Sequence, residues 1–238
     1  MSSIILPLIK NLKIITKKEK FFYLLKNSKY KTKTITFLNA NTLNQCFENK
    51  KLNNIIKNSK NLLRDGLGVK IACQLNGINS GLNMNGTDLI PEILQKLKFR
   101  KIAFIGGESN IIKKNKKILI KKYKPVLITH GYKSFNLYIN EIKKRKPDVL
   151  ILGMGTPRQE FFSKYLEKKL KSKMLIINGG AIINFITGEE KRANQYFRKL
   201  GIEWLFRFYN DPLRLFKRYI IGNPLLILRI INEKYFNK

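Results

Sequence analysis

The chain has 238 residues, of which 44% are hydrophobic, so it can bury a sizeable core and is too apolar to be disordered. Its 48 Lys and Arg against 15 Asp and Glu give a formal net charge of +33, which favours an anionic partner such as nucleic acid, anionic lipid or a nucleotide. The alternative source of this charge is an AT-biased genome, which enriches the encoded protein in lysine. No apolar run reaches the roughly 20 residues that cross a bilayer, and Pro7 and Lys10 interrupt the first run, so we predict neither a spanning helix nor a secretion signal.

Short apolar runs alternate with lysine-rich amphipathic stretches along the chain. Strands are predicted in 34–40, 101–107, "PVLITHG", "PDVLILGMG" and "KMLIINGGA", with helices between them, one starting at Asn41 and one in "SNIIKKNKKILIKKY". This alternation predicts an α/β fold with a mostly parallel, doubly wound sheet flanked by helices. We expect a core over residues 1–200 and a basic helical appendage over 201–238.

Small or polar residues follow the predicted strands. Ligands of such sheets bind at the carboxyl ends of the strands, where glycines let backbone N–H groups approach an anion. The residues expected there are Asn39, Gly106, Gly107, Gly155, Gly179 and Gly180. His130 also follows a strand, but as the single histidine it is not expected to be an essential base.

Asp65 lies in the glycine turn "LRDGLGV", just before a predicted helix. One interpretation is a helix cap. The other is a general base that accepts a proton from a sugar hydroxyl, since the neighbouring glycines leave room for a sugar ring.

The segment "GTPRQE" follows the strand "DVLILGMG" and starts a helix near Thr156. It is either a capped helix start or a phosphate site that uses free N–H groups, with Gln159 as a polar ligand contact.

Metal and cysteine chemistry is not expected. No two aspartates are separated by one residue, so a D-x-D metal motif is absent, as is a G-x-x-x-x-G-K-[ST] loop. Cys46 and Cys73 are expected to be buried, reduced thiols.

The C-terminal segment combines aromatic residues with arginines. Core packing accounts for Trp204 but not for Arg192, Arg198 and Arg207. Asp211 and Pro212 are predicted to start a helix that ends at Gly222. One face of this helix carries Leu213, Phe216 and Ile220, and another carries Arg214 and Arg218. Asn223–Pro224 are predicted to start a second helix. Such helices either lie on an anionic membrane surface or pack on the core.

Six motifs in this order resemble the WecG/TagA/CpsF family of bacterial glycosyltransferases: "FLNA", "DGLGV", "NGTDL", "GMGTPRQE", "NGGAIINFITG" with "KRA", and "LGIEWLFRFYNDPLRLFKRY". The resemblance covers about residues 30 to 220. It implies a Rossmann-like fold and transfer of N-acetylmannosamine, its uronic acid or a hexose from a UDP-sugar to an undecaprenyl-diphosphate-linked acceptor. It further implies inverting, metal-independent chemistry without a cofactor, in cell-surface polysaccharide synthesis at the cytoplasmic membrane face.

By position, the resemblance implies that Asp65 is the catalytic base. Asn39 would contact the substrate beside it, Gln159 would bind nucleotide-sugar or acceptor, and Arg214 with Arg218 would hold diphosphate. The other expected substrate contacts are Asp88, Thr156 and Arg192.

Four positions depart from the family pattern. Phe37 stands where Thr is usual, Asn83 where Arg is common, and Asn184 and Asn194 where Asp and Pro are usual. A weakened relative that still binds UDP-sugar is therefore one alternative, and a basic nucleic-acid-binding α/β protein is another, although no RNA-binding signature is present.

Overall fold

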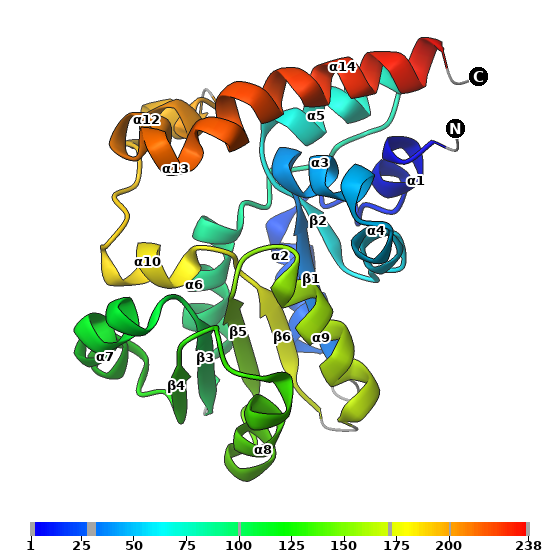
Figure 1. Cartoon of the computed structure of the whole chain (residues 1–238). Helices are drawn as coiled ribbons and strands as arrows, with labels where there is room; N and C mark the ends of the chain where they lie inside the picture. Colours follow the sequence, from blue (N-terminus) through cyan, green and yellow to red (C-terminus); the bar gives the residue numbers. More distant parts are fainter. Residues whose placement is uncertain (1–2, 28–31, 100, 171–172, 200, 237–238) are drawn as a thin grey trace.

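The computed structural model describes residues 3–27, 32–99, 101–170, 173–199 and 201–236. Within these ranges six strands form one sheet in the order β2-β1-β6-β5-β3-β4 (Figure 1). Every pair of neighbouring strands is parallel. The predicted fold class, an α/β fold with a parallel sheet and flanking helices, is confirmed.

The strands correspond to the apolar runs of the sequence. They are β1 (Lys33–Leu38), β2 (Leu62–Arg64), β3 (Ile102–Gly106), β4 (Leu127–Thr129), β5 (Val149–Gly153) and β6 (Leu175–Asn178). β2 has no counterpart among the predicted strands because its two leucines are followed by Arg64 and do not form an apolar run.

The helices occupy the amphipathic stretches between the strands. They are α1 (Ile5–Lys10), α2 (Lys18–Lys26), α3 (Ala40–Glu48), α4 (Lys50–Lys57), α5 (Leu67–Leu75), α6 (Gly86–Leu97), α7 (Ser109–Tyr123), α8 (Phe135–Arg145), α9 (Arg158–Lys169), α10 (Ile182–Thr187), α11 (Gln195–Lys199), α12 (Glu203–Asn210), α13 (Pro212–Phe216) and α14 (Gly222–Tyr235), with a π-helical turn, η1 (Lys217–Ile221), between the last two.

Both faces of the sheet are covered. Side chains alternate across a strand, so Val149 and Ile151 face the cluster formed with α2, α6, α7 and α10, whereas Leu150 and Leu152 face α8 and α9. A third cluster joins the end of the sheet at β1 and β2 to α1, α3, α4, α5 and α14. Cys46 and Cys73 lie buried in this third cluster as free thiols, as predicted.

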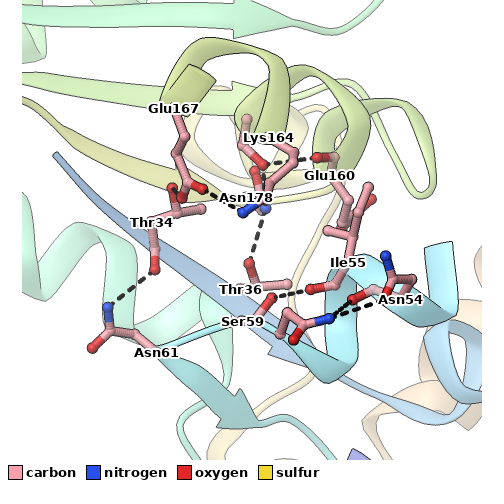
Figure 2. A network of polar contacts seen from close by, with 12 residues as sticks. Thr34, Thr36, Asn54, Ile55, Ser59, Asn61, Glu160, Lys164, Glu167 and Asn178 are labelled. Carbon is pink, nitrogen blue, oxygen red and sulfur yellow. Dashed lines mark hydrogen bonds and ion pairs between the residues drawn. The ribbon is translucent and has the colours of Figure 1, made fainter. Parts of the chain in front are cut away.

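A buried polar network links α9 to the middle of the sheet (Figure 2). The Asn178 amide nitrogen at the end of β6 donates to Thr36 Oγ1 of β1 at 3.1 Å and to Ser163 Oγ of α9 at 3.3 Å. Ser163 Oγ donates in turn to the Glu160 carbonyl oxygen at 3.0 Å. These bonds fix the N-terminal half of α9 at the carboxyl end of the sheet.

The C-terminal helices differ from the prediction at one point. Asp211 caps α13 by accepting from the Arg214 backbone N–H, as expected. The predicted helix end at Gly222 is wrong, because η1 leads directly into α14. Pro224 lacks an amide hydrogen, and the π turn before it is the kind of local widening that absorbs such an interruption. Gly222 instead permits a close approach, since its carbonyl oxygen accepts from Asn44 Nδ2 at 2.6 Å.

The last helix packs on the core with one side and leaves the other uncovered. Leu226 and Ile230 are buried with α3 and α5, along which α14 runs in Figure 1. Glu233 accepts hydrogen bonds from Ser3 Oγ and from the backbone N–H groups of residues 4 and 5, which joins the two ends of the described chain. The expected boundary between core and appendage falls at residue 200, which lies outside the described residues.

The C-terminal helices also expose large apolar side chains, here called the outer apolar surface: Leu205, Tyr209, Leu213, Phe216, Ile220, Ile221, Leu228, Ile231, Tyr235 and Phe236. Leu213 is 95% exposed. Packing of this segment on the core is thus confirmed for one side of α14, whereas contact of the exposed side with a membrane stays a prediction. Within the described ranges, no helix has the length and apolar character needed to span a bilayer.

Candidate active site

Two cavities lie side by side at the carboxyl end of the sheet. The strand-end cavity, about 290 Å³, is lined by the turns that follow β3, β4, β5 and β6, including Gly107, Gly131, Gly153, Gly155, Gly179 and Gly180. The appendage cavity, about 700 Å³, lies between α5 and the C-terminal helices, with Trp204, Tyr219, Pro224 and Leu226 among its lining residues. A small glycine-lined space thus adjoins a larger, more apolar one.

Six residues belong to the walls of both cavities: Asn39, Asn41, Asp65, Thr87, Arg207 and Arg218. Asp65 is the one carboxylate in this shared set. A molecule in either cavity can therefore reach Asp65, and molecules in both would meet beside it.

The backbone of Asp65 is held firmly. Its N–H donates to the Leu38 carbonyl at 2.9 Å, which continues the pairing of β2 with β1. The guanidinium of Arg64 donates to three carbonyl oxygens, those of Gly66, Ser80 and Gly81. The N-cap of α5 is Gly66 and no side chain caps this helix, so the cap interpretation of Asp65 is wrong.

The Asp65 carboxylate accepts a hydrogen bond from Asn39, whose own amide oxygen caps α3 by accepting from the Thr42 N–H at 3.0 Å. Burial raises the pKa of Asp65 above its usual value. The Arg218 charge and the Asn39 hydrogen bond oppose that rise in pKa, and Glu203 adds to it. A carboxylate that faces two cavities and has a raised pKa is a stronger proton acceptor than an ordinary aspartate.

Gln159 connects two turns at the cavity wall. Its amide oxygen accepts from the Gly180 N–H at 2.9 Å, and its amide nitrogen donates to Glu160 Oε1 at 2.8 Å. Thr156 Oγ1 donates to the same Glu160 oxygen at 3.3 Å. Gln159, Thr156, Gly155 and Gly180 line the strand-end cavity, as expected for ligand contacts.

Glu160 itself is 1% exposed, and burial raises its pKa to about 7. Its second carboxylate oxygen has no hydrogen-bond partner in the described part of the chain. Burial, with a smaller contribution from Glu160, raises the pKa of the nearby Cys46 thiol to about 12. Glu160 thus supports Gln159 from below the cavity rather than facing the cavity.

Two of the predicted contacts line neither cavity. Gly106 lies under Gly153, where an added Cβ would come within 2.3 Å of the Gly153 backbone, so its missing side chain serves strand packing. Arg192 pairs with Asp88 and lies 3.6 Å from a Glu203 oxygen. Asp88 lines the appendage cavity and also accepts from Arg198 at 2.9 Å, so this cluster ties α6 to the C-terminal segment.

Three arginines of the C-terminal helices reach the strand-end cavity: Arg207, Arg214 and Arg218. Glu190 Oε2 accepts from Arg207 at 3.1 Å, and Glu190 Oε1 accepts from Arg214 at 3.2 Å. Arg214 also pairs with Asp211. The appendage thus supplies positive charge where the glycine turns leave backbone N–H groups.

The departures from the family pattern have local partners. Asn83 accepts from the Gly66 N–H at 2.9 Å and so steadies the turn next to Asp65. Asn184 donates to Glu190 at 3.2 Å, which sets a carboxylate beside this amide. Asn194 accepts from the Phe197 N–H at 3.1 Å, and Phe37 lines the strand-end cavity.

Sequence reasoning did not select Arg207, Glu190 or Glu203 as site residues. The one indication in the sequence was that core packing did not explain Arg207 or its neighbouring arginines. Conversely, His130 lines neither cavity and accepts from the Tyr132 N–H at 3.3 Å. In the described ranges, no three His, Cys, Asp or Glu side chains lie in an arrangement that could hold a metal ion.

A parallel α/β sheet with glycine turns at its strand ends, beside arginines of the C-terminal helices and one shared carboxylate, is an arrangement suited to bind phosphate-bearing ligands. The model of the Glycosyl transferase WecG/TagA/CpsF family matches residues 11–238, so the chain belongs to this family and is a glycosyltransferase.

Relatives in Staphylococcus aureus strains MW2, NCTC 8325 / PS 47 and MRSA252 are named N-acetylglucosaminyldiphosphoundecaprenol N-acetyl-beta-D-mannosaminyltransferase. Each is 27% identical to this chain over 186 residues, which is 76% of this chain and 72% of the relative.

Proposed function

We propose that this glycosyltransferase moves N-acetylmannosamine from a UDP-sugar to an N-acetylglucosamine unit carried on undecaprenyl diphosphate, with inversion at the anomeric carbon. The names of the staphylococcal relatives support this sugar and this acceptor. The observation that carries the mechanism is the position of Asp65 in the wall common to both cavities.

The donor would occupy the strand-end cavity and the acceptor sugar the appendage cavity. Asp65 takes the proton of the acceptor hydroxyl as its oxygen forms a bond to the anomeric carbon. The bond from that carbon to the phosphate oxygen breaks, and UDP leaves with the electron pair. Asn39 keeps the Asp65 carboxylate oriented toward the hydroxyl.

Charge on the leaving diphosphate would be stabilised by Arg207 and Arg218, which lie in both walls, by Arg214, and by N–H groups of the Gly155 turn. Such fixed positive potential lowers the barrier because it is in place before charge develops. We therefore propose catalysis without a metal ion or another cofactor.

The outer apolar surface would rest on the cytoplasmic face of an anionic membrane. Its side chains are exposed on helices that also carry Lys217 and Lys234, a combination that binds anionic bilayers. The adjoining appendage cavity would then open beside the lipid that carries the acceptor.

Transfer can be tested with purified protein, UDP-N-acetylmannosamine and a short-chain lipid-diphosphate-N-acetylglucosamine, with and without EDTA. We expect EDTA-resistant product with an inverted linkage. Loss of product in EDTA contradicts the metal-free mechanism. UDP-sugar binding without turnover for any donor supports the weakened-relative alternative. Retention on RNA without liposome binding at physiological salt supports the nucleic-acid alternative.

A further inference from the structure

Two of the three cavity arginines share one carboxylate. Glu190, in the segment between α10 and α11, accepts from Arg207 of α12 and Arg214 of α13 at 3.1 and 3.2 Å. Both arginines line the strand-end cavity, whereas Glu190 does not. The carboxylate therefore lies behind the arginines and holds them at the cavity wall.

Glu190 is fixed in this place by contacts on its other sides. Its side chain is 16% exposed, and Oε1 also accepts from the Asn184 amide at 3.2 Å. Its backbone N–H donates to the Asn184 carbonyl at 3.1 Å. The Arg207 guanidinium lies over the Phe185 ring at 4.9 Å. The carboxylate and Arg207 thus form a rigid unit with α10.

The two arginines differ in how easily they can leave Glu190. The Arg207 side chain is 16% exposed, but that of Arg214 is 52% exposed and its other partner, Asp211, belongs to the same helix turn. Arg218 differs from both, because it forms no ion pair with a carboxylate in the described part of the chain. Arg214 is therefore the cation that can change partners.

A diphosphate in the strand-end cavity needs the same guanidinium N–H groups that Glu190 now occupies. A carboxylate close to a diphosphate also repels it, because both are negative and the site is partly buried. Either effect weakens diphosphate binding unless Arg214 turns away from Glu190 toward the ligand. The bidentate geometry of a guanidinium suits both partners equally.

We propose that Glu190 is an internal competitor that occupies Arg214 until a substrate diphosphate takes its place, while Arg207 stays paired. This inference rests on the proposed function, since it assumes that the strand-end cavity receives a diphosphate. Glu190 is then a positioning residue that sets diphosphate affinity by competition. Its removal tightens binding, which a merely structural role would not produce.

The test compares Glu190→Gln with the matched control Glu189→Gln in the full chain. Glu189 is the adjacent residue but pairs with Lys114 and Asn115 of α7, away from the arginines. Calorimetric titration with inorganic pyrophosphate should show about two- to fivefold tighter binding for Glu190→Gln, the worth of one partly exposed ion pair, and no change for Glu189→Gln. The KM for UDP-sugar should fall in parallel.

UDP and farnesyl diphosphate serve as further ligands to separate the two sources of a diphosphate. If the variant binds only UDP more tightly, Glu190 competes with the diphosphate of the donor. If it binds only farnesyl diphosphate more tightly, Glu190 competes with the diphosphate of the acceptor. Fluorescence of Trp204, the single tryptophan, reports whether the C-terminal helices stay docked. If Glu190→Gln undocks them, Glu190→Asp, whose shorter side chain withdraws from Arg214 but keeps its charge, should give a smaller gain in affinity.

Unchanged or weaker pyrophosphate binding in docked Glu190→Gln and Glu190→Asp overturns this inference. If the wild type and all variants fail to bind pyrophosphate or UDP, the proposed function fails together with the inference. Binding by the wild type that the variants do not tighten removes the inference alone.

Discussion

Replacing Glu160 by Gln should change how the stability of the protein depends on pH. Burial raises the pKa of Glu160 from 4.5 to about 7 in the folded chain. Because the folded state holds this proton more tightly than the unfolded state, the stabilising contribution is complete below pH 4.5. It is lost as the pH rises through the folded pKa near 7.

The size of the effect follows from the shift in pKa. A rise in pKa of about 2.5, at about 1.4 kcal/mol for each pH unit, corresponds to about 3.5 kcal/mol over the full titration. Gln is nearly the same shape as Glu and stays neutral, so it removes this dependence. Relative to the wild type, Glu160→Gln should gain about 2.5 kcal/mol in free energy of unfolding between pH 5 and pH 8, because part of the titration lies below pH 5.

Urea denaturation of both proteins at pH 5, 6, 7 and 8 measures this difference. Glu189→Gln is the control, since the Asn115 and Lys114 contacts hold the pKa of Glu189 below its usual value. The free energy of Glu160→Gln minus that of the wild type should rise with pH over this range. Parallel curves for the wild type and Glu160→Gln would refute the reasoning, because they would show that Glu160 does not titrate with a raised pKa.

Three further predictions concern the site and the membrane surface. Asp65→Asn should lower turnover by about 10²- to 10⁴-fold with Trp fluorescence unchanged, whereas near-normal turnover removes Asp65 from the mechanism. Because Asp65 must be ionised to act, turnover should rise with pH through its raised pKa, and Arg218→Gln should move this rise to higher pH while Glu203→Gln moves it to lower pH. A pH profile that neither variant shifts speaks against Asp65 as the base. Leu213→Glu should weaken sedimentation with anionic liposomes by about tenfold, since Leu213 is 95% exposed. The control Leu24→Glu on α2 should leave sedimentation unchanged. Equal losses in both variants would show that the outer apolar surface does not bind the membrane.

Local patterns of the sequence were enough to predict the architecture. Buried parallel strands are continuous apolar runs, and glycines mark their carboxyl ends, so the layers and the site edge follow from segments such as "PDVLILGMG". Asp65 was noticed in the same way, because a carboxylate in a glycine turn is unusual in a chain of net charge +33, but its choice as the base over a helix cap came from the family resemblance. The helix start at Asp211 likewise depends on only a few neighbouring residues, and the helix predicted from Asn41 begins at Ala40 with Asn39 as its cap.

Other features depend on contacts between distant segments. Gly222 was expected to end a helix, but its place is set by Asn44, which lies 178 positions earlier. Arg192 was expected at substrate, but Asp88 binds it across 104 positions. Local periodicity carries no information about such pairs.

The sequence by itself therefore determined the α/β layers, the glycine-lined edge and the candidate base. Only the tertiary structure decided which charges meet there: Arg207 and Arg218 beside Asp65, and Glu190 behind Arg207 and Arg214. The physical reason is range. Burial and turn formation are settled within a few residues, whereas the pairing of charges depends on how the C-terminal helices pack against the core.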